Sequence, residues 1–138
     1  MTEMFLINMK LPSLNDVIKK NRENRYSGNN YKKEIEEIIG WNIKKALCSG
    51  TLTPRTEPVD IVIDYYELTR KRDVDNIQSS TKFILDALVK NGVLKNDGRK
   101  YVNQIYHRIF DIDKPLNDYC YVALMPAGSV ELKFVFDK

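Results

Sequence analysis

The segment of residues 59–90 reads VDIVIDYYELTRKRDVDNIQSSTKFILDALVK, and its change of hydrophobic period decides the fold. Residues 59–68 alternate between two sets of side chains, which is the period of a β-strand. In residues 76–90 the apolar side chains recur at helical spacing, and Asn91-Gly92 is a typical helix stop. The segment therefore predicts a strand, a short polar connection and a helix.

The sequence on either side predicts further elements. Upstream, residues 5–9 predict a strand, Ser13 predicts the N-cap of a short helix, and the polar residues 21–30 predict a mobile loop. Residues 31–47 predict a helix, and three strands are expected at residues 101–110, 119–125 and 130–136. The stripe expected to be buried on the 31–47 helix comprises Ile35, Ile38, Ile39, Asn42 and Ala46.

This order of elements predicts an α+β fold in which helices pack on one face of a mixed β-sheet. The length of 138 residues fits one domain spanning residues 1–138, and 43% hydrophobic residues are enough for a core. We expect Trp41 to belong to that core, with a place in a subunit interface as the alternative.

Composition limits the functional classes. The formal net charge of +3 agrees in sign with a polyanionic partner but does not establish one. Cys48 and Cys120 are far apart and have no neighbouring histidine, so a disulfide framework or a zinc site is not expected. The first residues lack a cationic leader, and no stretch approaches the roughly 20 apolar residues of a membrane span. We therefore expect a soluble cytoplasmic protein.

Three acidic residues form the main chemical signal. Asp73 and Asp75 stand two apart where the strand passes into the helix, and in extended backbone such residues point to the same side, roughly 6.5–7 Å apart. Asp97 lies in a loop beyond the helix and joins them only if the chain doubles back. Hard carboxylate oxygens suit Mg²⁺ or Mn²⁺, which promote phosphodiester hydrolysis. The residues therefore predict a metal site, conditional on that closure.

Ordinary structural roles also account for these residues when each is taken alone. An Asp-x-Asp pair is short, and Asp75-Asn76 fits a helix N-cap. Lys82 and Asp86 are four apart, as in a plain surface ion pair on a helix. We expect Ser79 and Ser80 to face solvent on that helix. His107 has no recognisable partner in the sequence, so no covalent route through a serine–histidine pair is indicated.

The combination of motifs resembles the RusA-type Holliday-junction resolvases. The elements that carry the resemblance are Arg72-Asp73-Val74-Asp75-Asn76, then Lys82 followed by Asp86-Ala87-Leu88, then Asn96-Asp97, eleven positions after Asp86. The upstream element Leu11-Pro12-Ser13-Leu14-Asn15 also resembles the family's Pro-Ser-x-Asn motif. Asn76 and Lys82 are six positions apart, which exceeds the family spacing by almost one helical turn.

The resemblance implies a homodimeric endonuclease that nicks four-way DNA junctions with Mg²⁺ or Mn²⁺. It implies Asp73, Asp75 and Asp97 as metal ligands, Lys82 as the catalytic lysine and Asp86 as a fourth acid. Two other classes stay open: a nucleic-acid-binding module without catalysis, and another phosphodiesterase with the same carboxylates.

Basic and polar residues near the predicted site are candidates for DNA contact. Such side chains position DNA through its phosphates, although a solvated charged face is an equally good interpretation of any one of them. The candidates are Arg70, Lys71, Arg72, Asn76, Lys95, Arg99 and Lys100.

Overall fold

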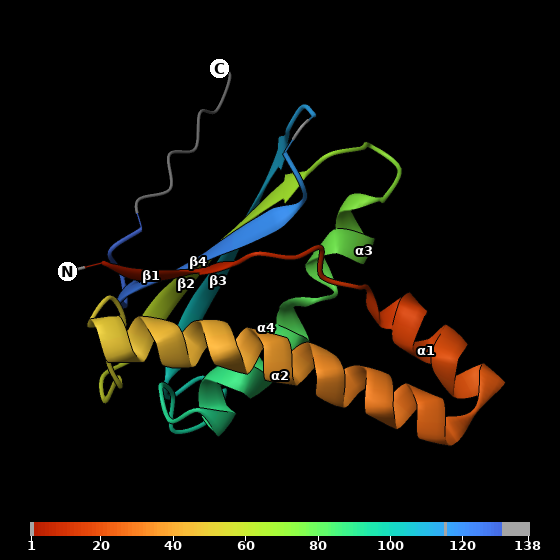
Figure 1. The fold of residues 1–138 in the computed structure, drawn as a ribbon. Coiled ribbons are helices and arrows are strands. Elements are labelled where there is room, and N and C mark those ends of the chain that lie inside the picture. Colours follow the sequence, from red (N-terminus) through yellow and green to blue (C-terminus); the bar gives the residue numbers. More distant parts are fainter. Residues whose placement is uncertain (1, 115, 131–138) are drawn as a thin grey trace, which may run out of the picture.

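The fold is a four-stranded sheet with its helices on one side (Figure 1). The computed structural model describes residues 2–114 and 116–130. Its elements are β1 (Glu3–Ile7), α1 (Leu14–Glu23), α2 (Arg25–Ser49), β2 (Val59–Glu67), α3 (Val74–Gln78), α4 (Thr81–Lys90), β3 (Val102–Asp111) and β4 (Tyr119–Pro126). The predicted α+β class and mixed sheet are therefore confirmed.

The strand order β1-β4-β2-β3 makes the sheet mixed. β4 runs antiparallel to both β1 and β2, whereas β2 and β3 are parallel. Parallel neighbours need a crossover connection, which α3 and α4 supply. The chain therefore leaves β2 at the carboxyl end of the parallel pair and enters β3 at its amino end.

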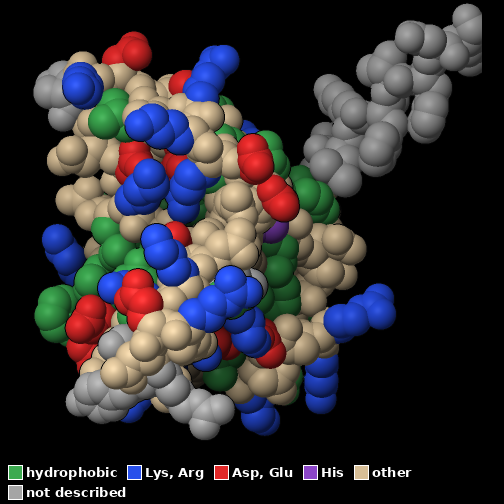
Figure 2. Space-filling view, turned by 90° about the vertical axis from the view of Figure 1, so that its right-hand side faces the viewer, with side chains coloured by type: hydrophobic (Ala, Val, Ile, Leu, Met, Phe, Trp, Pro, Cys, Tyr) green, Lys and Arg blue, Asp and Glu red, His purple; other side chains and the backbone are tan. Residues whose placement is uncertain are grey.

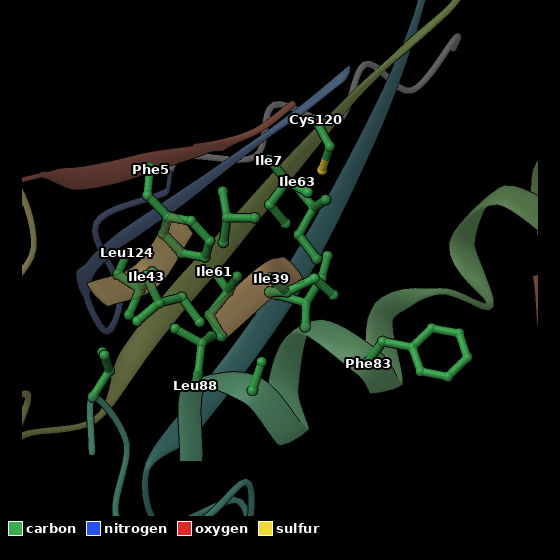
Figure 3. Packing of buried hydrophobic residues seen from close by; sticks show 14 of the residues in the cluster. Phe5, Ile7, Ile39, Ile43, Ile61, Ile63, Phe83, Leu88, Cys120 and Leu124 are labelled. Carbon is green, nitrogen blue, oxygen red and sulfur yellow. The ribbon is translucent and has the colours of Figure 1, made fainter. Parts of the chain in front are cut away.

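The core lies between the sheet and the two helices α2 and α4 (Figure 3). β2 turns alternate residues inward, as predicted, and Ile61 and Ile63 are completely buried there. From α2, Ile39 and Ile43 meet this surface, and Leu88 of α4 completes it. Burial of side chains of this size stabilises the fold by about 1.5–3 kcal/mol each.

Several predictions about α2 are confirmed and others are wrong. Ile35, Ile39 and Ala46 are buried as predicted, but the buried stripe continues through Ile43 and leaves Ile38 and Asn42 partly exposed. The prediction that Trp41 belongs to the core is wrong, because its side chain is 67% exposed. Helical spacing therefore predicted the buried side of α2 correctly but not all of the residues that form the buried stripe.

The predicted loop at residues 21–30 is instead helical. α1 continues to Glu23, α2 starts at Arg25, and only Asn24 between them has extended backbone, with φ −171° and ψ 125°. Gly28 lies inside α2 where α1 passes very close. A β-carbon at this position would clash with Oδ1 of Asn21, so the absence of a side chain leaves room for α1. The glycine therefore reflects the close approach of the two helices, whereas the polar residues 21–24 are exposed to solvent.

The predicted helix at residues 76–90 is two helices. α3 ends at Gln78, Ser79 is its C-cap, and α4 starts at Thr81. Ser80 is completely buried between them, so the prediction that it faces solvent is wrong. The expected stop at Asn91-Gly92 is confirmed, with Asn91 as C-cap and Gly92 at φ +77°.

The first strand runs over Glu3–Ile7, two residues earlier than expected. The strand expected at 130–136, including Phe134 and Phe136, lies outside the described residues apart from Val130. No helix in the described part of the chain combines the length and the apolar character that crossing a bilayer requires.

Candidate functional site

The upstream motif segment, residues 11–15, contacts the central motif segment, residues 72–76. Nη1 of Arg72 donates to the carbonyl oxygen of Leu11 at 2.6 Å, and Nδ2 of Asn15 donates to Oδ1 of Asn76 at 2.9 Å. Each of these bonds joins residues 61 positions apart. Ser13 forms a capping box with Asp16, which starts α1 and so fixes the position of Asn15.

Arg72 is a structural residue in this arrangement. Its guanidinium also binds Oε1 of Glu67 through Nε at 2.9 Å and Nη2 at 2.8 Å. The side chains of Arg72 and Glu67 are only 15% and 5% exposed. The donors of Arg72 are directed at Glu67 and Leu11, and its predicted contact with DNA stays a prediction. The pair of Arg72 and Glu67 anchors the Leu11 segment to the carboxyl end of β2.

Asp73 and Asp75 lie at the start of α3. Asp73 is its N-cap with extended backbone, whereas Asp75 already belongs to the first helical turn. The predicted geometry, with both residues in extended backbone, is therefore wrong. Both residues are exposed, and among the described residues neither side chain has a hydrogen-bond or ion-pair partner. They are two available carboxylates at one helix start.

A second acidic group surrounds Lys82. Its Nζ donates to Oδ2 of Asp97 at 2.9 Å and lies 3.1 Å from Oδ1 of Asp86. The hydrogen bonds with Asp97 and then Asp86 raise the pKa of Lys82, and the bond from Lys82 lowers the pKa of Asp97. The loop that carries Asp97 has thus doubled back onto the first turn of α4.

The structure does not bring the three predicted metal ligands together. In residues 2–114 and 116–130, no three Asp, Glu, His or Cys side chains form a group that could hold a metal ion. The topology gives the reason: Asp73 follows the carboxyl end of β2, and Asp97 precedes the amino end of β3. In a parallel pair these two ends lie at opposite ends of the strands, and the Asp97 loop returns only as far as Lys82 in the first turn of α4.

The donor chemistry still suits a hard cation at the start of α3. Asp73 and Asp75 offer exposed carboxylate oxygens, and such ligands bind Mg²⁺ while it keeps several waters. Asp97 is a ligand of the same kind, but its carboxylate is engaged by Lys82. The donor chemistry therefore suits a metal at two of the three predicted positions.

Basic side chains gather on the face formed by α1 and α3, with acidic side chains between them (Figure 2). Arg70 is highly exposed but pairs with Asp111 at 2.6 Å. Lys71, Lys95 and Arg99 are exposed and have no ion-pair partner among the described residues. Two further candidates have local contacts: Asn76 with Asn15, and Lys100 with the ring of Tyr101 at 5.8 Å.

A partly buried polar network beside α4 was not predicted from the sequence. Oη of Tyr65 lies within hydrogen-bond distance of Oγ of Ser80 and of Oγ1 of Thr81. Oγ1 of Thr81 lies in turn 2.7 Å from Nε2 of His107. The histidine therefore does have a partner. The available signal was the run of three hydroxyl residues at 79–81, because such side chains often bind a nearby backbone carbonyl at a helix end.

Comparison of the sequence with known protein families and with characterised proteins finds no match.

Proposed function

We propose that this protein is a divalent-metal-dependent DNA endonuclease of the RusA type, acting on four-way junctions in recombination and repair. One observation carries the proposal: motif segments distant in the sequence meet at the start of α3. Arg72 and Asn76 of the central motif bind Leu11 and Asn15 of the upstream motif. A chance match of short motifs does not require such contacts.

The proposal gives each acidic residue a role. Asp73 and Asp75 would hold Mg²⁺, or Mn²⁺ in its place, and Asp97 would be the third ligand after leaving Lys82. The metal would supply a water of lowered pKa and neutralise the charge between nucleophile and phosphate. Lys82 would then be available to stabilise the charge on the scissile phosphate, with Asp86 holding its amine in place.

Substrate and assembly follow from the same proposal. Exposed Lys71, Lys95 and Arg99 would contact DNA phosphates without reading sequence. Symmetrical nicking of a junction needs two sites related by a two-fold axis, so we propose a homodimer. Recombination intermediates lie in the cytoplasm of cells without a nucleus, and we propose that location for the protein.

A nucleic-acid-binding module without catalysis is the second candidate. It is favoured by the pairing of Asp97 with Lys82, which takes both groups away from a metal at the start of α3. In that case Asp73 would serve only as the N-cap of α3, and Lys82 would serve only in ion pairs.

Cleavage of a synthetic four-way junction separates the two candidates. We expect the wild-type protein to nick the junction with Mg²⁺ or Mn²⁺, and we expect Asp73→Asn and Asp75→Asn to bind it without nicking. Asp113→Asn is the matched control, because Asp113 is also an exposed acid but lies outside the motifs. Binding without nicking by the wild-type protein would favour the module, and equal cleavage of linear duplex would indicate a general nuclease.

A further inference from the structure

The junction between α3 and α4 is closed by hydroxyl groups. The hydroxyl of Ser80 donates to the carbonyl oxygen of Ile77 at 2.9 Å, and that of Thr81 donates to the carbonyl oxygen of Gln78 at 2.7 Å. Each hydroxyl carries one hydrogen, so both oxygens are left to accept. Both backbone carbonyl groups at the break are therefore hydrogen-bonded. The two hydroxyl oxygens can still accept hydrogen bonds from the sheet.

Two strands of the sheet supply the donors. Oη of Tyr65 on β2 lies 3.0 Å from Oγ of Ser80, and Nε2 of His107 on β3 lies 2.7 Å from Oγ1 of Thr81. Because the serine and threonine hydrogens are already used, Tyr65 and His107 must donate. The proton count therefore assigns the Nε2-protonated tautomer to His107, and burial lowers its pKa, which favours the neutral ring.

The two donors form one rigid support. The rings of Tyr65 and His107 are stacked, with centroids 6.2 Å apart and planes at 13°. Tyr65 is 2% exposed and Ser80 is fully buried, so an unpaired hydroxyl at this place is costly. The end of α3 and the first residue of α4 are thus fixed to adjacent parallel strands.

This support lies where the chain departs from the family pattern. The longer spacing between Asn76 and Lys82 contains the α3–α4 break, and Thr81 directly precedes Lys82. In one continuous helix, six positions turn a side chain about 600°, or 240° net, to a different face. The break allows Lys82 to take a direction that helix periodicity would not give it.

We infer that Tyr65 and His107 are positioning residues, which hold the α3–α4 junction and so fix the place of Lys82 relative to the start of α3. The inference rests on the proposed nuclease function for its catalytic consequence. The anchoring of the junction stands on the hydrogen bonds alone.

Single-turnover nicking of the junction tests the catalytic part. Thr81→Val removes the acceptor for His107, and Tyr65→Phe removes the donor to Ser80. A small displacement of a reacting group lowers a rate by up to about 100-fold, so we expect nicking about 10-fold to 100-fold slower with unchanged junction affinity. Thr81→Ser keeps the hydroxyl and should restore the rate. Tyr66→Phe, on the same strand but the opposite sheet face, is the matched control.

Two results would overturn this part of the inference. One is a nicking rate of Thr81→Val equal to that of the wild-type protein. The other is a parallel fall of nicking rate, junction affinity and melting temperature, which would indicate general destabilisation. A wild-type protein that nicks nothing would instead refute the proposed function.

Amide hydrogen exchange tests the anchoring without any activity. Phe83 donates its amide hydrogen to the carbonyl oxygen of Ser80 at the junction. Exchange of this amide should be about 10-fold faster in Thr81→Val than in the wild-type protein or Thr81→Ser. Long-range ¹H–¹⁵N NMR should show the Nε2-protonated ring of His107. Unchanged exchange, or a ring protonated at Nδ1, would show that the network does not hold the junction.

Discussion

Two arginines of one short segment pair with carboxylates in very different surroundings. The side chains of Arg70 and Asp111 are 85% and 51% exposed, whereas those of Arg72 and Glu67 are 15% and 5% exposed. An exposed ion pair contributes little because water and salt screen it. Loss of one partner from a buried pair leaves a charge without compensation.

Arg72→Met should therefore lower the free energy of unfolding by about 3 kcal/mol or more, because it leaves Glu67 buried and unpaired. Arg70→Met should lower it by less than about 1 kcal/mol. Urea unfolding followed by circular dichroism measures both changes. Equal losses in the two variants would contradict the structural role given to Arg72.

Glu3 makes a pH-dependent contribution to stability. Burial by itself raises the pKa of this carboxyl group, but hydrogen bonds from Arg55 and Thr53 outweigh burial and lower it below the ordinary 4.5. A lowered folded-state pKa stabilises the protein above the unfolded-state pKa, and this contribution disappears as the pH falls through the folded-state value.

Glu3→Gln should thus lower the free energy of unfolding by about 1–3 kcal/mol at pH 7, because the variant loses the ion pair with Arg55. The difference from the wild-type protein should shrink as the pH falls below 4.5. Urea titrations at a series of pH values measure it. A difference that grows towards acidic pH would show that the sign is wrong.

At the scale of single elements, the N-terminus of α1 has a local determinant. Oγ of Ser13 accepts from the amide of Asp16, and the Asp16 carboxylate accepts from the amide of Ser13. Ser13→Ala should lower the free energy of unfolding by about 1 kcal/mol, whereas Ser13→Asp should lose much less because aspartate also caps helices. Thermal unfolding measures both, and equal stability of Ser13→Ala and the wild-type protein would contradict the capping box.

The local sequence predicted the type of an element correctly where the hydrophobic period and the capping residues agreed. The alternation in residues 59–68 gave β2, the serine at position 13 gave the start of α1, and Asn91-Gly92 gave the end of α4. These features depend on backbone propensity and on one buried face, which the sequence records directly.

Other features depended on contacts between elements. Gly28 and its polar neighbours predicted a loop because the approach of α1 to α2 is not visible in local composition. Ser80 was predicted to face solvent because its contact with Tyr65, fifteen positions earlier in the chain, is not visible in the local sequence. For the candidate site, the spacing of Lys82 and Asp86 indicated their ion pair, but the path of the Asp97 loop depends on how the whole crossover packs.

At the scale of the whole molecule, the parallel pair of β2 and β3 sets the arrangement of the site. α3 follows the carboxyl end of β2, and the Asp97 loop leads into the amino end of β3. α3 and α4 cross between these ends on the covered face, anchored midway by Tyr65 and His107. A shared metal site therefore requires Asp97 to leave Lys82 and approach the start of α3.

Paramagnetic broadening by Mn²⁺ tests that requirement most directly. In ¹⁵N-labelled protein, we expect substoichiometric Mn²⁺ to broaden the amide signals of Val74–Asn76 and Asn96–Gly98 together, and Mg²⁺ to reverse the effect. Asp73→Asn should abolish broadening in both segments, whereas Asp113→Asn should leave it intact. Broadening confined to one segment, or unaffected by Asp73→Asn, would contradict the claim that these carboxylates share one ion.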